Sequence, residues 1–182
     1  MRLAEEDRSE IKKKIEEQLK PIFKNLSLIT EEIVNLDYWR YHRAFRPGLQ
    51  EFIESLALYH YLMNETLITR EEVENYVLQH NPKNMKLEIS FEDYILGICD
   101  FTGEAMRLCI NSVSSRNFSK CKKIYQFLQT IYSNLLKLPE FDNEVPKKLS
   151  VMAASLQKVE MVNFNLELRG TEYPLDFNQI DI

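Results

Sequence analysis

Residues that turn or break a chain are scarce in this sequence, which has only 4 Gly and 6 Pro among 182 residues. A β-sandwich or β-barrel needs many tight turns, whereas a few long helices need few. Apolar residues also recur every three or four positions over long stretches, as at Ile15, Leu19, Ile22 and Phe23, which is the spacing of a helix face. We therefore predict an all-α fold, an antiparallel helical bundle of about six to seven helices.

Several sequence signals indicate where these helices begin and end. Thr69 to Glu72 has the pattern of a capping box, and Ser90 to Asp93 has a similar one, so a helix is expected to start at each. Pro47, followed by Gly48, indicates either a kink or a new helix start. Gly170 is expected to cap the last helix. The predicted helices run from about residue 9 into the thirties and over 38–63, 69–81, 90–113, 119–138 and 147–169.

The length fits one domain with a sizeable core, which we expect to cover residues 1–182 with tails at 1–8 and 171–182. No apolar run approaches the roughly 18 to 20 residues of a membrane span, and no membrane association is expected. Cys99, Cys109 and Cys121 lack metal-type spacing and are typical of reduced core residues in a cytoplasmic or nuclear protein. The net charge of −5 argues against a broad basic surface for nucleic acid, but it leaves open nucleic acid held in a local cleft.

Two pairs of carboxylates lie at helical spacing among apolar residues. Glu51 and Glu54 are three residues apart and Asp100 and Glu104 are four apart, so each pair shares a helix face. Carboxylates crowded together repel and need protons, arginine partners or a divalent cation. Oxygen ligands suit Mg²⁺ or Mn²⁺. Solvated pairs are the alternative, and Arg107 could simply pair with Glu104.

The segment 38–43 mixes aromatic and basic residues, a combination that could stack on RNA bases and neutralise phosphates. Its candidate RNA-binding residues are Arg40, His42 and Arg43, and Arg107 is a further candidate for phosphate contact. Packing at an interface and ordinary salt bridges are the alternatives. If one helix continues from this segment to Glu54, both of its arginines fall on the carboxylate side.

Three segments resemble the translin superfamily, and its Trax branch more than translin itself: GLQEFIESL (48–56), DYILGICDFTGEAMRLCINSV (93–113) and KKLSVMAASLQKVEMVNFNLELRG (147–170). The likeness runs from about residue 38 to 170. The N-terminal region and the segment between 81 and 90 are shorter than in typical Trax. The resemblance implies a translin-like all-α fold. It also implies a closed, octamer-like barrel built with translin-like subunits, with single-stranded RNA handled inside.

Trax is the ribonuclease subunit of such complexes and Mg²⁺ is its metal, so the resemblance assigns Glu51, Glu54, Asp100 and Glu104 as catalytic and metal-binding acids. They would hold one or two Mg²⁺ ions, with Mn²⁺ as the alternative, and a metal-bound water would attack the phosphodiester. We therefore predict a Mg²⁺-dependent endoribonuclease subunit, of a kind linked to passenger-strand removal in RNA silencing and to tRNA-fragment processing. A non-catalytic RNA-binding or assembly subunit is the first alternative, and a helical protein–protein adaptor is the second.

Overall fold

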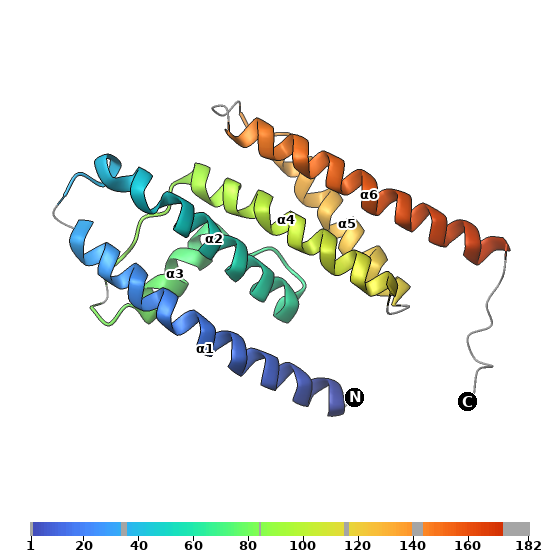
Figure 1. The fold of residues 1–182 in the computed structure, drawn as a ribbon, viewed down its shortest axis with the longest axis horizontal. Coiled ribbons are helices and arrows are strands. Elements are labelled where there is room, and N and C mark those ends of the chain that lie inside the picture. The colour runs from blue at the N-terminus through green and yellow to red at the C-terminus, as the bar shows by residue number, and fades with distance from the viewer. Residues whose placement is uncertain (1, 34–35, 84, 115–116, 140–143, 173–182) are drawn as a thin grey trace. The chain divides into compact units, whose positions relative to one another are not determined.

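The computed structural model describes residues 2–33, 36–83, 85–114, 117–139 and 144–172, and the side chains of all of these except 2–8, 11, 114, 167 and 169–172. Over these residues the chain forms six α-helices and no β-strand (Figure 1). The helices are α1 (Arg2–Ile33), α2 (Tyr38–Asn64), α3 (Arg70–His80), α4 (Phe91–Ser114), α5 (Phe118–Leu135) and α6 (Glu144–Glu172). Within the described ranges, no helix is long and apolar enough to cross a membrane. The all-α prediction is confirmed.

Helices α3 and α4 begin where their capping signals predict. At α3, the backbone N–H of Glu72 donates to Thr69 Oγ1 over 3.2 Å, and the backbone N–H of Thr69 donates to Glu72 Oε2 over 2.7 Å. At α4, the backbone N–H of Asp93 donates to Ser90 Oγ over 3.0 Å. These bonds satisfy N–H groups that have no partner inside the first turn of a helix, and they fix where both helices start.

Two helices begin earlier than the sequence pattern indicated. Helix α1 starts at Arg2 instead of Ser9, so residues 2–8 are helical rather than a tail. Helix α6 starts at Glu144 instead of Lys147. Pro146 lies in the first turn of α6, where its missing N–H would have had no partner in any case. The predicted start of α6, directly after Pro146, was therefore three residues too late.

The ends of two helices also differ from the prediction. Helix α6 continues to Glu172, so the expected C-cap at Gly170 is wrong. Glycine lowers helix stability by only about 1 kcal/mol, so one glycine does not end a helix by itself. Helix α5 ends at Leu135, three residues before the predicted end at 138. Most of the predicted tail, residues 173–182, lies outside the described residues.

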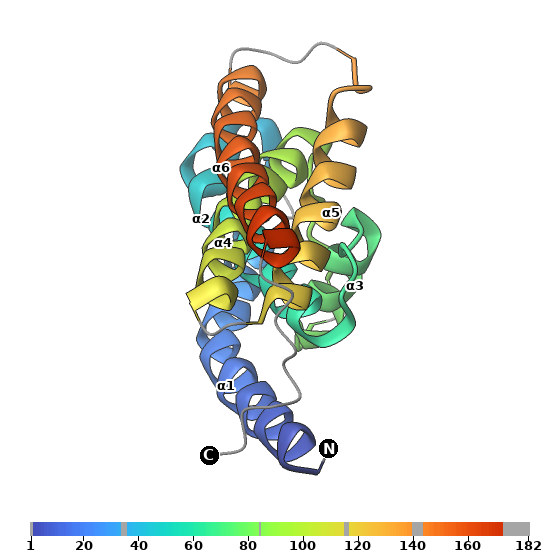
Figure 2. The ribbon, with the colours of Figure 1, turned by 90° about the vertical axis from the view of Figure 1, so that its right-hand side faces the viewer.

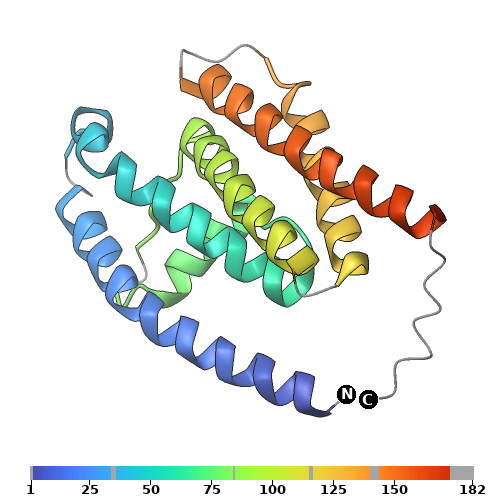
Figure 3. The same ribbon diagram turned by 45° about the vertical axis from the view of Figure 1, so that its right-hand side comes forward.

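The chain divides into two compact units, unit 1 (Met1–Phe101) and unit 2 (Thr102–Ile182), and the boundary falls inside α4. The expected single domain over residues 1–182 stays a prediction. In unit 1, α1 runs antiparallel beside α2 and also contacts α3 (Figure 3). The ring of Phe23 from α1 meets the ring of Phe52 from α2 edge-on, with centroids 5.6 Å apart.

Residues 85–90 lead into the start of α4 and are held against the rest of unit 1 by buried side chains and by hydrogen bonds. Leu87 and Ile89 are buried, while Lys86 and Glu88 are exposed. The carbonyl oxygen of Ile89 accepts a hydrogen bond from Arg70 over 3.1 Å, and that of Glu88 accepts one from the Tyr38 hydroxyl over 2.9 Å. Both bonds fix the position at which α4 begins.

In unit 2, α5 and α6 lie side by side and run in opposite directions (Figure 2). The second half of α4 contributes Cys109, whose sulfur lies 2.8 Å from the sulfur of Cys121 on α5. All three cysteines of the chain are free and buried, as expected for reduced core residues. Burial and the neighbouring Cys121 raise the pKa of the Cys109 thiol, which keeps it protonated.

Candidate functional site

Helices α2 and α4 run parallel and approach closely at Gly97. A Cβ atom at this position would lie 2.7 Å from Ile53 Cβ and 3.0 Å from the carbonyl oxygen of Gln50, which is closer than such atoms pack. Further along the same pair of helices, the rings of Tyr61 and Phe101 have centroids 6.2 Å apart. The two helices therefore contact each other at two levels, and glycine is required where the two backbones meet.

The carboxylate of Asp93 lies at the start of this contact, is fully buried and accepts four side-chain hydrogen bonds. Oδ1 accepts from Arg46 Nε over 2.8 Å and from Gln50 Nε2 over 3.0 Å. Oδ2 accepts from the Ser90 hydroxyl and from His42 Nε2, both over 2.5 Å. Three consecutive turns of α2 are thus tied to one residue of α4, and this sets the register of the two helices.

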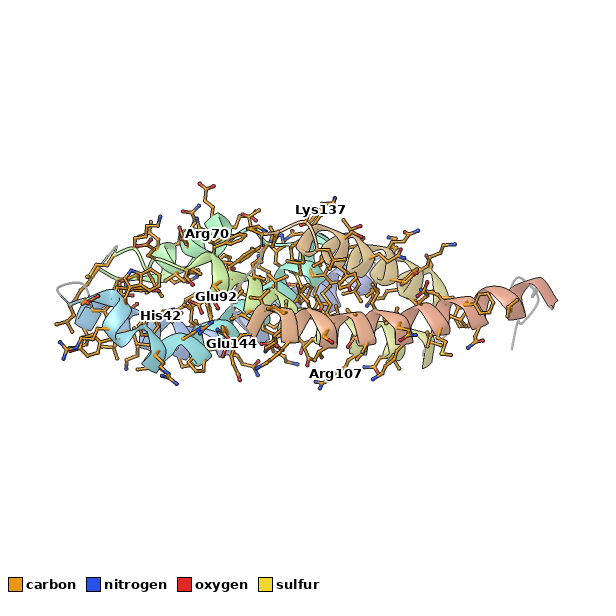
Figure 4. All side chains as sticks on the ribbon, turned by 90° about the horizontal axis from the view of Figure 1, so that it is seen from above. His42, Arg70, Glu92, Arg107, Lys137 and Glu144 are labelled. Carbon is orange, nitrogen blue, oxygen red and sulfur yellow. The ribbon has the colours of Figure 1, made fainter. Side chains whose placement is uncertain are left out.

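The charge of Asp93 is compensated inside the protein. Burial alone would raise the pKa of this carboxyl, but the hydrogen bonds from Ser90, Gln50 and His42 outweigh burial and hold its pKa below the usual value. Arg46 also bonds Glu92 over 2.9 Å, and Figure 4 shows His42 and Glu92 near each other in this part of unit 1. Because Asp93 is already surrounded by donors, its role is to join helices, and it is a poor candidate for a metal ligand.

The same register applies to two of the four predicted catalytic acids. One turn beyond Gln50 on α2 is Glu54, and one turn beyond Gly97 on α4 is Asp100. Both side chains are half-buried, while Glu51 is exposed. Glu54 directly follows Ile53, which contacts Gly97, and Asp100 lies one turn beyond Gly97, so both acids are close in sequence to this contact.

The fourth acid, Glu104, follows one turn after Asp100 in α4 and belongs to unit 2. Its carboxylate forms an ion pair with Arg107, which is the alternative that the sequence left open. The Arg107 side chain is 71% exposed and points away from its helix (Figure 4). In the described conformation, Glu104 is thus already engaged with a cation.

Metal-binding capacity depends on how many such groups converge. Within the part of the chain that the structure describes, no three His, Cys, Asp or Glu side chains form a group that could hold a metal ion. The chemistry of the donors does fit Mg²⁺, because all four acids offer oxygen and three of them are at least half-buried. The catalytic and metal-binding roles of Glu51, Glu54, Asp100 and Glu104 stay predictions.

The aromatic and basic segment at the start of α2 has an exposed side. Trp39 is 67% exposed, and Tyr41, Arg40 and Arg43 are exposed as well. The Arg40 guanidinium lies 5.8 Å from the centre of the Tyr41 ring, a cation–π distance. Helix α2 continues without a break through Pro47, so both arginines fall on the side of α2 that carries Glu51 and Glu54.

His42 differs from its neighbours because its ring is turned inward. It donates to Asp93 and stacks on Tyr38, with ring centroids 5.3 Å apart, and it meets the edge of Phe45 at 5.5 Å. Its expected contact with RNA stays a prediction, but its observed contacts are those of a residue that positions others.

The sequence pattern did not lead us to predict the buried hydrogen bonds of Asp93 that join α2 to α4, although it contained an indication of them. His42, Arg46 and Gln50 follow each other at intervals of four, so three polar side chains share one helix face. Asp93 was noted only as the reciprocal residue of a capping box. A polar stripe on a helix that is otherwise apolar points to a buried polar partner, and Asp93 is that partner.

Comparison with known proteins extends these observations over almost the whole chain. The model of the Translin family matches residues 2–170. Translin-associated protein X of Rattus norvegicus is 31% identical over 187 aligned residues, which cover 92% of this chain and 64% of that protein. Translin of Pongo abelii is 29% identical over 133 residues, which cover 73% of this chain and 58% of that protein.

Similarity of fold accompanies similarity of sequence. A chain in the crystal structure of apo-NeC3PO superposes with a TM-score of 0.57 and 25% identity, over 87% of this chain and 85% of that chain. The resemblance inferred from the three sequence segments, to Trax more than to translin, is confirmed. The chain belongs to the Translin family.

Proposed function

We propose that this chain is the nuclease subunit of an RNA-processing assembly, and that it hydrolyses phosphodiesters in single-stranded RNA with the help of Mg²⁺. The similarity to translin-associated protein X supports this function, although the chain spans only 64% of that protein. The observation that carries the proposal is the register of α2 and α4. Glu54 directly follows Ile53, which contacts Gly97, and Asp100 lies one turn beyond Gly97; this proximity supports a shared site for the two acids.

Glu51, Glu54, Asp100 and Glu104 would hold the ion, with Mn²⁺ as a possible substitute for Mg²⁺. When bound, the metal would lower the pKa of a coordinated water and stabilise charge on the phosphate. Glu104 would exchange its ion pair with Arg107 for this role. Arg107 would then be free to contact a phosphate of the RNA.

The exposed side of α2 offers a route for the RNA backbone toward the acids. Arg40 precedes Glu51 by eleven residues, and Arg43 precedes Glu54 by eleven. Eleven residues are about three helical turns, so each pair shares a side of α2 and is separated by roughly 16 Å. The arginines would bind phosphates a few nucleotides away from the bond that is cut, and Trp39 offers a surface on which a base could stack.

Assembly with translin-like subunits, in a closed octamer-like barrel, is the partner arrangement that we propose. Helix α6 supports it, because it packs on α5 through one face and exposes apolar residues on another. Met161 is 68% exposed and Phe164 60% exposed. Large apolar side chains that gather on one exposed helix face are typical of an interface.

The test is a cleavage assay on the chain co-expressed with a translin subunit. We expect the complex to cut single-stranded RNA in Mg²⁺, to retain activity in Mn²⁺ and to lose it in EDTA. Glu17→Gln, which removes an exposed acid on α1, should leave the rate unchanged. Cleavage that continues undiminished in EDTA would exclude the metal mechanism.

A non-catalytic subunit that binds RNA or supports assembly is the second candidate. The ion pair between Glu104 and Arg107 favours it, as does the finding that no three potential metal ligands converge within the described ranges. On this alternative the chain itself would not cleave RNA. Replacing its four acids with amides would then change neither the RNA binding of the complex nor any cleavage by another subunit.

A further inference from the structure

Unit 1 contains a cavity of about 270 Å³ between α1 and the end of α3, away from the acids on α2 and α4. Its wall includes the ring of Phe23 from α1 and the ring of His80 from α3. The two rings stack face to face, with centroids 4.2 Å apart and planes inclined by 10°. The cavity is at the small end of ligand sites, so it suits one small molecule better than a length of polymer.

His80 is held in one orientation and in one tautomer. A carbonyl oxygen can only accept a hydrogen bond, so the 2.8 Å contact of His80 Nδ1 with the Tyr76 carbonyl oxygen places a proton on Nδ1. The other ring nitrogen, Nε2, has no hydrogen bond with any residue that the structure describes. It therefore remains available to a ligand in the cavity.

Ser27 provides a second polar group at the cavity. This residue lines the cavity and is only 5% exposed. Among the described residues, no hydrogen bond uses its hydroxyl, whereas the hydroxyl of nearby Thr30 donates to the Leu26 carbonyl oxygen over 2.7 Å. The Ser27 hydroxyl oxygen is not among the fully buried polar atoms that lack a partner, so water reaches it, and a ligand in the cavity would take the place of that water.

The charges around the cavity favour an anion. Lys20 and Lys24 both line it and are one turn apart on the same side of α1. The one acid in the lining, Glu31, is ion-paired with Lys83 over 2.9 Å, so its charge does not oppose an anionic ligand. Two ammonium groups one turn apart suit a phosphate group.

We propose that this cavity binds a single phosphorylated nucleotide. Lys20 and Lys24 hold its phosphate, the Ser27 hydroxyl forms a hydrogen bond with it, and the wall of Phe23 and His80 contacts its base. The combination of an aromatic wall with two cations matches a ring that carries a phosphate, whereas inorganic phosphate alone would leave the apolar wall unused. The site does not depend on the proposed nuclease activity.

The test is a binding titration of the full chain with adenosine 5′-monophosphate, uridine 5′-monophosphate, adenosine and inorganic phosphate, followed by calorimetry or ligand-observed NMR. We expect both mononucleotides to bind saturably at or below millimolar concentration, and adenosine and phosphate to bind at least about tenfold more weakly. No saturable binding of either mononucleotide would overturn the proposal, and so would equal affinity for phosphate alone.

Matched variants separate the site from general attraction between charges. Lys20→Gln with Lys24→Gln should lower affinity at least about tenfold, while Lys13→Gln, on the same helix but outside the cavity, should leave it unchanged. Ser27→Ala should weaken binding without lowering the melting temperature, because its hydroxyl bonds to no described residue. An equal loss in Lys13→Gln would overturn the proposal.

A titration with a 5′-phosphorylated dinucleotide distinguishes the two possible sources of the ligand, an RNA end and a free nucleotide. Tighter binding than the mononucleotide assigns the site to an RNA end, and weaker binding assigns it to a free nucleotide.

Discussion

Asp93→Asn is the change that most directly tests how the two helices of the candidate site are held together. The substitution keeps the shape of the side chain but removes its charge. It also replaces one oxygen with an NH₂ group, which cannot accept the bonds that oxygen received. Asp93 is fully buried, so water cannot replace the lost interactions. Arg46, whose side chain is only 22% exposed, would lose its buried anionic partner.

The expected cost follows from these contacts. Removing one partner of a buried ion pair typically costs about 3–5 kcal/mol. Glu92 still bonds Arg46 over 2.9 Å, and the Ser90 hydroxyl can rotate, so we expect the lower end, about 3 kcal/mol. Glu92→Gln is the matched control, because it removes a partner of the same arginine from a side chain that is 36% exposed. It should cost no more than about 1 kcal/mol.

Urea denaturation followed by circular dichroism measures both values. The pH dependence gives an independent check, because the pKa of Asp93 is lower in the folded chain than its ordinary value of 3.8. Its contribution to the free energy of unfolding is therefore complete above pH 3.8 and is lost as pH falls through the folded pKa. The difference between wild type and Asp93→Asn should shrink over that range. Equal costs for Asp93→Asn and Glu92→Gln at neutral pH would refute the reasoning.

Gly97→Ala should destabilise unit 1 by about 1–3 kcal/mol in the same urea assay, because its Cβ would lie 2.7 Å from Ile53 Cβ. Gly48→Ala, whose added Cβ would meet none of the described atoms within 4 Å, should instead be neutral or stabilise by up to about 1 kcal/mol; a similar loss in both would contradict the close packing at Gly97. Phe164→Asp with Met161→Asp should leave the melting temperature of the chain unchanged, because both side chains are exposed, but should prevent assembly with a translin subunit. Light scattering measures that assembly, and a full-sized particle from the double variant would exclude this face of α6 as the interface.

Much of the fold follows from local patterns in the sequence. The capping residues Thr69 and Ser90 and the apolar periodicity located α3 and α4 closely. The predicted helix boundaries were wrong where the residues at a helix end give no strong capping signal. Pro146 is accepted in a first turn and Gly170 in a last one, so neither residue sets a boundary. The sequence also could not decide whether Pro47 interrupts α2, because neighbouring packing determines whether a helix continues through a proline.

The candidate site was only partly predictable, because its geometry depends on contacts between helices. Helical spacing placed Glu51 beside Glu54 and Asp100 beside Glu104, but it could not give the register of α2 against α4. That register depends on Gly97 and on the Asp93 network. The pairing of Glu104 with Arg107 was foreseen as an alternative. The inward orientation of His42 was not, since its partner lies 51 positions away in the sequence.

The four acids can be tested together by comparing melting curves with single-turnover RNA cleavage, using the assembled complex and the variants Glu51→Gln, Glu54→Gln, Asp100→Asn and Glu104→Gln. Without metal, we expect each variant to be about as stable as wild type, since the largely exposed ion pair that Glu104→Gln removes contributes at most about 1 kcal/mol. The stabilisation by Mg²⁺ should shrink in all four, and cleavage should fall by at least about a hundredfold. Variants that melt early, yet cleave RNA at the full rate in their folded fraction, would contradict the assignment of these acids as metal ligands of a nuclease.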